Sequence, residues 1–164
     1  MSRAALPPFQ TLIDAHGADV LGFLRAMAGP QDAEDVFQDT YLAALRAYPK
    51  ADPRNLRAWI FTIARRKAID HHRGRARWPE PVGDIERHRA AEGPDARGGS
   101  RDGDVWPLVA ALPPKQRAAV ALRFVADLRY REIGVALGVS ETAARRSVHD
   151  GLRNLRGEIS KETK

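Results

Sequence analysis

One stretch in the middle of the chain limits every fold that the sequence can adopt. Residues 79–104 read PEPVGDIERHRAAEGPDARGGSRDGD, and Val82 and Ile85 are their only large aliphatic side chains. A segment so rich in proline, glycine and charge cannot bury enough apolar surface to offset the entropy lost on ordering it. We therefore expect a flexible linker at 79–104 between two domains, residues 1–78 and 105–164, each long enough to fold if helical.

Helical periodicity dominates both of these segments. Apolar side chains recur three and four positions apart in the first, which predicts a three-helix bundle with helices at 9–27, 32–48 and 55–73. The second segment is expected to hold four shorter helices, at 105–111, 114–126, 130–137 and 141–157. The predicted fold class is therefore all-α, with two small helical domains.

Several side chains in the first bundle have specific expected places. Asp32 is expected to cap the second helix, and Asn55 can cap the third. Leu45 belongs to the predicted core face of the second helix. On the third helix, Phe61 lies off the predicted core stripe.

The segment YREIGVALGVSETAARRSVHDGLRNLR, residues 130–156, has the order of signals typical of a helix-turn-helix. Gly138 is expected to end the first helix in the left-handed conformation. Val139 then supplies an apolar turn residue, and Ser140 can cap the second helix. In that second helix Ala144, Val148, Leu152 and Leu155 face inward. This arrangement predicts a helix presented to the major groove of double-stranded DNA.

The outward face of that helix carries the side chains that would contact DNA. Arginine suits this task because its fork matches guanine O6 and N7, or a phosphate. An ordinary helical hairpin with a solvated basic face is the plainer alternative, but the ordered glycine, apolar residue and cap favour DNA binding. The candidate residues are Thr142, Arg145, Arg146, His149 and Arg153, with Arg156 also facing outward.

Charge and composition restrict the partners. The net charge is +6, which favours a polyanionic partner such as nucleic acid. Lysine and arginine outnumber carboxylates 12 to 8 in residues 1–78 and 11 to 6 in 105–164, whereas carboxylates lead 7 to 4 in 79–104. Cysteine is absent, so the chain has no disulfide or thiolate metal site. With no signal peptide or apolar run of membrane-spanning length, we expect a cytoplasmic protein without membrane insertion.

The helix at 32–48 carries an acidic and amide face outside its core stripe. Asp35, Gln38, Asp39 and Leu42 lie on this face. Carboxylates near a helix N-terminus interact favourably with the helix dipole. This explains the acidic residues in the first turn but not the polar and apolar residues that follow on the same face. The face is also typical of a docking surface for a basic protein, and the residues alone leave these two readings open.

The following stretch, residues 53–77, has the opposite character, with eight arginines and lysines against one acid, Asp70. Arg66, Arg73 and Arg77 fall along one helical stripe that could follow a phosphate backbone. A helix face that is only solvated would carry a more even balance of basic and acidic side chains. His71 and His72 are adjacent and point in different directions, so no metal site is expected, and no cofactor, catalytic residue or small-molecule substrate is indicated.

Four motifs together resemble a known family. DAEDVFQDTYLAAL (32–45), AWIFTIARRKAIDHHR (58–73), LPPKQRAAVALRFVADLRYREIGVALGVS (112–140) and LRNLR (152–156) look like a bacterial sigma factor of the sigma-70 family. The resemblance is to the small extracytoplasmic-function (ECF) group, and it covers both halves of the chain in the same order.

The resemblance implies a role for each surface. Residues 1–78 would be sigma domain two, with Asp35, Gln38, Asp39 and Leu42 on the β′ coiled coil of core RNA polymerase. Residues 105–164 would be sigma domain four, reading the minus-thirty-five element and contacting the β flap. An anti-sigma factor would hold the protein inactive. The surface implied for capture of the single-stranded minus-ten element comprises Arg54, Asn55, Arg57, Arg65, Arg66 and Arg73.

This sequence departs from the family pattern in the recognition helix. Ala143, Ala144 and Asp150 replace residues usual in the family, so the promoter sequence does not transfer. Gly151 stands in place of an alanine and is expected to cost the helix up to about 1 kcal/mol. Two other functions remain open from the residues: a stand-alone helix-turn-helix regulator, and an adaptor that mimics a sigma factor without melting DNA.

Overall fold

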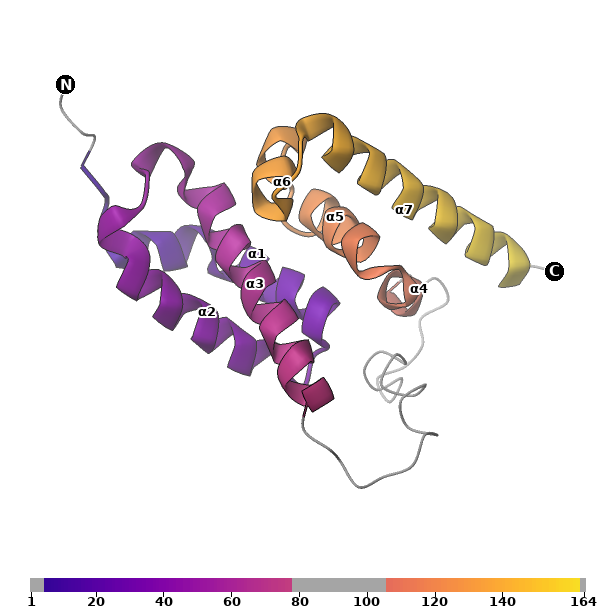
Figure 1. Ribbon diagram of the computed structural model, residues 1–164, viewed down its shortest axis with the longest axis horizontal. Helices are drawn as coiled ribbons and strands as arrows, with labels where there is room; N and C mark the ends of the chain where they lie inside the picture. Colours follow the sequence, from indigo (N-terminus) through magenta and orange to yellow (C-terminus); the bar gives the residue numbers. More distant parts are fainter. Residues whose placement is uncertain (1–4, 78–105, 163–164) are drawn as a thin grey trace.

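The computed structural model describes residues 5–77 and 106–162, and the linker predicted at 79–104 lies outside these ranges. Every regular element within them is helical, which confirms the all-α prediction (Figure 1). Each predicted α-helix is present, with ends within five residues of those expected from the sequence. The helices are α1 (Phe9–Ala28), α2 (Ala33–Ala47), α3 (Leu56–Arg77), α4 (Trp106–Ala111), α5 (Pro114–Phe124), α6 (Tyr130–Leu137) and α7 (Glu141–Glu162).

Helices α1, α2 and α3 form the predicted three-helix bundle. Two 3-10 turns, Tyr48–Lys50 and Pro53–Asn55, connect α2 to α3, and the carboxylate of Asp52 accepts a hydrogen bond from the Arg54 backbone N–H at 3.0 Å. Pro49 is the second residue of the first turn and Pro53 is the first residue of the second, because the fixed φ of proline suits the start of a helical turn. The bundle core is aliphatic and aromatic, and none of the described helices is long and apolar enough to cross a membrane.

The prediction that Phe61 lies off the core of the bundle is wrong. Phe61 is fully buried and packs edge-on against Phe23, with ring centroids 5.7 Å apart. Helix α3 contacts α1 and α2 and also α6 from the second half of the chain. Because α3 is covered by three helices, its buried face is wider than the single stripe expected of a helix in an isolated bundle.

One prediction about α2 holds only in part, and a second is wrong. Asp32 is the N-cap residue of α2, but its side chain makes no capping hydrogen bond to the helix, and its carboxylate lies 3.3 Å from His71 Nε2. Leu45 is 52% exposed, because Thr40, Tyr41 and Ala44 form the buried stripe and Leu45 lies one residue beyond it. The exposed face of α2 is therefore more apolar than the sequence pattern indicates.

Helices α5, α6 and α7 pack closely because small side chains line their contacts. Ala118, Ala119 and Ala121 of α5 are buried, as are Ala144 and Gly151 of α7. A Cβ built on Gly151 would lie 2.6 Å from Val120 Cγ2, a separation that real Cβ atoms do not reach. Glycine therefore allows α7 to approach α5, which offsets the helix-propensity cost expected at this position.

Gly151→Ala should lower the free energy of unfolding by about 1 kcal/mol, since overpacking costs about 1–3 kcal/mol and alanine returns up to about 1 kcal/mol of helix propensity. Gly157→Ala on the same helix is the control, because no atom lies within 4 Å of its added Cβ, and it should stabilise the chain. Urea unfolding measures both. The close approach of α7 to α5 would be contradicted if Gly151→Ala stabilised the chain. It would also be contradicted if Gly151→Ala lowered the free energy of unfolding as much in a Val120→Ala background as in the unaltered chain.

The two halves of the chain do not stand apart. Helix α3 packs against α6, and α1 packs against α4 and α5. A single cluster of buried side chains runs through both halves and includes Phe23, Phe61, Leu122, Leu128 and Ile133. Figure 1 places α2 and α7 on opposite outer sides, with α1, α3, α5 and α6 between them. The sequence predicts two domains and a linker, and it does not predict this shared core.

Candidate functional site

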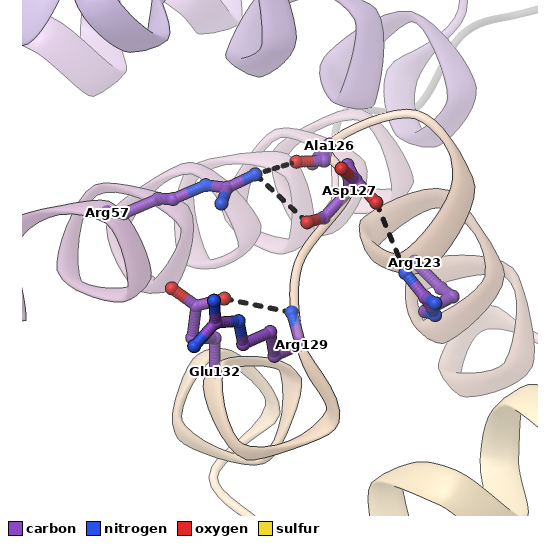
Figure 2. A network of polar contacts seen from close by, with 6 residues as sticks. All are labelled: Arg57, Arg123, Ala126, Asp127, Arg129 and Glu132. Carbon is purple, nitrogen blue, oxygen red and sulfur yellow. Dashed lines mark hydrogen bonds and ion pairs between the residues drawn. The ribbon is translucent and has the colours of Figure 1, made fainter.

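The helix-turn-helix has the local geometry that the sequence predicts. Helix α6 ends at Gly138, whose φ of 67° lies in the left-handed region. Val139 packs partly buried against the core, and Ser140 Oγ accepts a hydrogen bond from the Ala143 backbone N–H at 3.1 Å. The carboxylate of Glu132 accepts one from the Arg129 N–H at 2.8 Å (Figure 2). Both helices therefore begin with a satisfied backbone donor.

Helix α7 separates its side chains as predicted. Ala144, Val148 and Leu155 are buried, and Leu152 is half-buried. All five candidate DNA-contacting side chains are exposed on the other side of the helix: Thr142, Arg145, Arg146, His149 and Arg153. Helix α7 lies on an outer side of the molecule, so this face is open to a large ligand (Figure 1).

Two neighbours that the sequence analysis missed hold Arg145 in place. Its guanidinium carbon lies 4.7 Å from the ring centroid of Tyr130, and its Nη2 lies 3.3 Å from Glu141 Oε1. A cation over an aromatic face is attracted by the ring quadrupole. The side chain is thus oriented before any ligand binds. The Glu141–Arg145 spacing of four was a usable sequence signal for the ion pair, whereas the Tyr130 contact depends on how α6 packs on α7.

The predicted docking face of α2 is exposed along its length. Asp35, Gln38 and Asp39 are exposed, and Leu42 is 53% exposed. Leu45 follows one turn after Leu42 on the same surface, so the face continues from acidic to apolar. A surface of this kind offers both charge complementarity and a hydrophobic contact to a partner protein.

The six residues proposed for minus-ten DNA do not form one open surface. Arg54, Asn55, Arg66 and Arg73 are exposed, and Arg54 pairs with Asp52 at 3.0 Å. Arg65 is half-buried, and burial followed by the charge of Arg66 lowers the pKa of its guanidinium. Arg57 is half-buried, and its guanidinium reaches the second half of the chain.

Arg57 binds the turn between α5 and α6. Its Nη2 donates hydrogen bonds to the backbone carbonyls of Ala126 and Asp127, the latter at 3.0 Å (Figure 2). Asp127 has a φ of 51°, a left-handed conformation that aspartate tolerates better than most residues, and its carboxylate pairs with Arg123 at 3.2 Å. No sequence signal pointed to this contact, because its partners are backbone atoms 69 and 70 residues away.

His16 of α1 lies close to the same junction, and its protonation is coupled to it. Burial, and then the charge of Arg57, lower the pKa of His16, while the charges of Asp19 and Glu132 act in the opposite direction. The folded chain therefore disfavours the protonated imidazole. Below the ordinary pKa of 6.5 the unfolded chain binds a proton that the folded chain resists, so stability present above pH 6.5 is lost as the pH falls.

His16→Gln should reduce this loss of stability in acid. The free energy of unfolding should fall between about pH 7.5 and about pH 5.5 in the unaltered chain, and by less in the variant, because glutamine does not titrate. Urea unfolding at the two pH values measures the difference. An equal fall in both proteins would mean that His16 is protonated as easily in the folded chain as in the unfolded one.

The two halves each match a family model. Residues 12–77 match the model described as Sigma-70 region 2, and residues 104–155 match the one described as Sigma-70, region 4. The chain therefore belongs to the sigma-70 family of bacterial sigma factors, in its ECF group, which several curated relatives represent.

Two relatives show the extent of the similarity. The ECF RNA polymerase sigma factor SigE of Mycolicibacterium smegmatis is 32% identical over 98% of this chain, which spans 65% of that protein. The RNA polymerase sigma factor CarQ of Myxococcus xanthus is 32% identical over 94% of this chain and 92% of its own length.

Among solved structures, the sigma factor RpoE of Bartonella quintana, in complex with the anti-sigma factor NepR, has a similar fold. Its TM-score is 0.73 at 21% identity, over 93% of this chain and 96% of the other. This likeness supports the all-α arrangement of both halves.

Proposed function

We propose that this protein is a transcription initiation factor that binds core RNA polymerase and directs it to the promoters of a particular set of genes. The observation that carries the proposal is the combination, in one chain, of a region 2 bundle with an exposed acidic face and a region 4 helix-turn-helix with an exposed basic face. The protein acts by binding, without a catalytic step of its own, in the cytoplasm where polymerase meets DNA.

Each surface has one proposed task. Residues 1–78 dock on polymerase through Asp35, Gln38, Asp39 and Leu42, and Leu45 extends that contact. The exposed arginines of α3, with Arg54 and Asn55, hold the minus-ten element as a single strand. Residues 105–164 place α7 in the major groove at the minus-thirty-five element. The five candidate residues on α7 can reach base edges or phosphates because they are exposed on its outer face.

An anti-sigma protein is a further proposed partner. The RpoE structure of similar fold was solved with such a protein, NepR, which supports the existence of one for this chain. Since the chain has no cysteine, a thiol-based signal would have to be sensed by that partner.

Run-off transcription tests the proposal. Core polymerase with this protein should transcribe a subset of fragments from the genomic DNA of the source organism, and core polymerase alone should not. A stand-alone regulator would instead footprint duplex DNA at nanomolar concentration without polymerase, and this result would replace the proposal. An adaptor that cannot melt DNA would support transcription only from templates melted beforehand.

A further inference from the structure

One aromatic ring in the second half of the chain contacts cationic side chains from two other helices. Tyr130 is the first residue of α6, and it packs partly buried against the core. The guanidinium carbon of Arg145 in α7 lies 4.7 Å from the centroid of this ring, and that of Arg123 in α5 lies 5.5 Å from it. Two cations from different helices therefore meet at a ring that the core holds in place.

Each of these cations is also paired with a carboxylate four residues away in the sequence. Arg145 Nη2 lies 3.3 Å from Glu141 Oε1, and Arg123 Nη1 lies 3.2 Å from Asp127 Oδ1 (Figure 2). The side chains of Arg145 and Glu141 are both more than half exposed. Ion pairs so exposed contribute little and are screened by salt. Glu141 alone is therefore a weak restraint on Arg145, and the stronger restraint is the ring that packs against the core.

The ring and the carboxylate occupy different parts of the guanidinium. A carboxylate accepts hydrogen bonds from the N–H donors, which are the same donors that would bind guanine O6 and N7. A ring uses none of these donors, because the attraction is between the positive charge and the ring quadrupole. The phosphates of approaching DNA also repel the carboxylate of Glu141, whereas the tyrosine ring has no charge to repel. Tyr130 can thus orient Arg145 both before and after DNA binds.

We propose that Tyr130 is a positioning residue for promoter selection. Its ring holds the fork of Arg145 toward the minus-thirty-five element, and it contributes to the discrimination between DNA sequences without touching DNA itself. This inference rests on the proposed function and adds a specificity-determining residue to it. A preset fork favours a guanine edge over a phosphate, because two parallel hydrogen bonds to one base require a fixed orientation, whereas a phosphate accepts the charge from many directions.

NMR of the free protein tests the geometry independently of transcription. Side-chain protons of Arg145 that lie over the ring of Tyr130 should resonate upfield of those of other arginines, and Arg145→Lys identifies the signals by their disappearance. Tyr130→Leu should abolish the upfield shift, whereas Tyr130→Phe should preserve it because the ring remains. Arg145 signals that are the same in Tyr130→Leu as in the unaltered protein would overturn the inference.

The functional test uses a promoter recovered by the run-off experiment and a copy of it with a substituted minus-thirty-five element. The ratio of the two transcript yields should fall about two- to fivefold in Tyr130→Leu, which is the loss expected for an exposed cation–π contact. Tyr130→Phe should keep the ratio of the unaltered protein. In an Arg145→Ala background, Tyr130→Leu should change the ratio no further, because no guanidinium is left to orient.

Ile133→Val is the packing control, because it removes a methyl group from the fully buried side of α6 and keeps the ring of Tyr130. It should lower stability to urea without changing the transcript ratio. The inference is overturned if Tyr130→Leu lowers transcription from both promoters equally, as loss of packing alone would do. It is also overturned if Tyr130→Phe changes the ratio as much as Tyr130→Leu, since the hydroxyl would then be the group that matters.

Failure of the proposed function would look different from failure of this inference. The unaltered protein with core polymerase would then give no promoter-specific transcript, while the upfield shift of Arg145 would still depend on the ring of Tyr130.

Discussion

Replacing Asp35 and Asp39 by lysine should abolish binding to core RNA polymerase while the chain keeps its helical content. The two carboxylates lie four residues apart on the exposed face of α2, so they point in the same direction. Removing one partner of a charge pair buried in an interface costs about 2–5 kcal/mol, and reversal adds repulsion. We expect affinity for core polymerase to fall at least a hundredfold, measured by co-elution or fluorescence anisotropy.

A matched charge change elsewhere serves as the control. Asp14→Lys with Glu158→Lys alters the net charge equally, on exposed positions of α1 and α7. If this variant loses core binding to the same extent, long-range electrostatics and not the α2 face drives docking. Circular dichroism should be unchanged in both variants, because all four side chains are exposed and surface ion pairs contribute little to stability.

The parts of this structure that the sequence predicts are those whose causes are local. Gly138, Val139 and Ser140 adopt their expected places because each responds to its immediate neighbours: a left-handed helix end, an apolar plug and a cap. The exposed rows on α2 and α7 follow from helical periodicity in the same way. These local signals were enough to predict the fold class and to place the candidate side chains on exposed faces.

The parts that could not be predicted depend on contacts between distant segments. Arg57 was assigned to DNA because it lies in a basic helix, but its partners are the carbonyls of Ala126 and Asp127. A backbone carbonyl carries no residue type, so the sequence contains no mark of it. Leu45 was expected in the core and is exposed, whereas Phe61 was expected outside the core and is buried. Both outcomes also depend on how distant segments pack.

In the case of Phe61, a usable signal was present. A phenylalanine off the core stripe of an otherwise basic helix indicates a second buried face. Phe61 packs against Phe23 of α1, and α3 also contacts α6, so α3 is covered on more than one side. Leu45 shows the converse, since a leucine at the margin of an apolar stripe can be left exposed where α2 has neighbours on one side only.

Replacing Arg145 and Arg146 by alanine should remove the preference for the minus-thirty-five element while sparing affinity for core polymerase. Both side chains are exposed near the start of α7, the part of a recognition helix that reaches base edges. A direct guanine contact is worth about 1–3 kcal/mol, so each lost contact should lower transcription from a matching promoter by about fivefold to about 150-fold. Lys115→Ala with Arg131→Ala removes two other exposed cations of the same half, both outside α7, and is the control.

Arg145→Lys distinguishes a base contact from a phosphate contact. Glu141 and Tyr130 orient the guanidinium of Arg145, and a lysine keeps the charge but loses the planar fork. If Arg145 reads a base, lysine should not restore the activity lost in Arg145→Ala, and substitutions in the minus-thirty-five element should matter less. If it contacts a phosphate, lysine should restore most of the binding, and alanine should lower the salt dependence by about one unit. The preorganised fork makes base reading the expected result, because a phosphate contact needs only the charge.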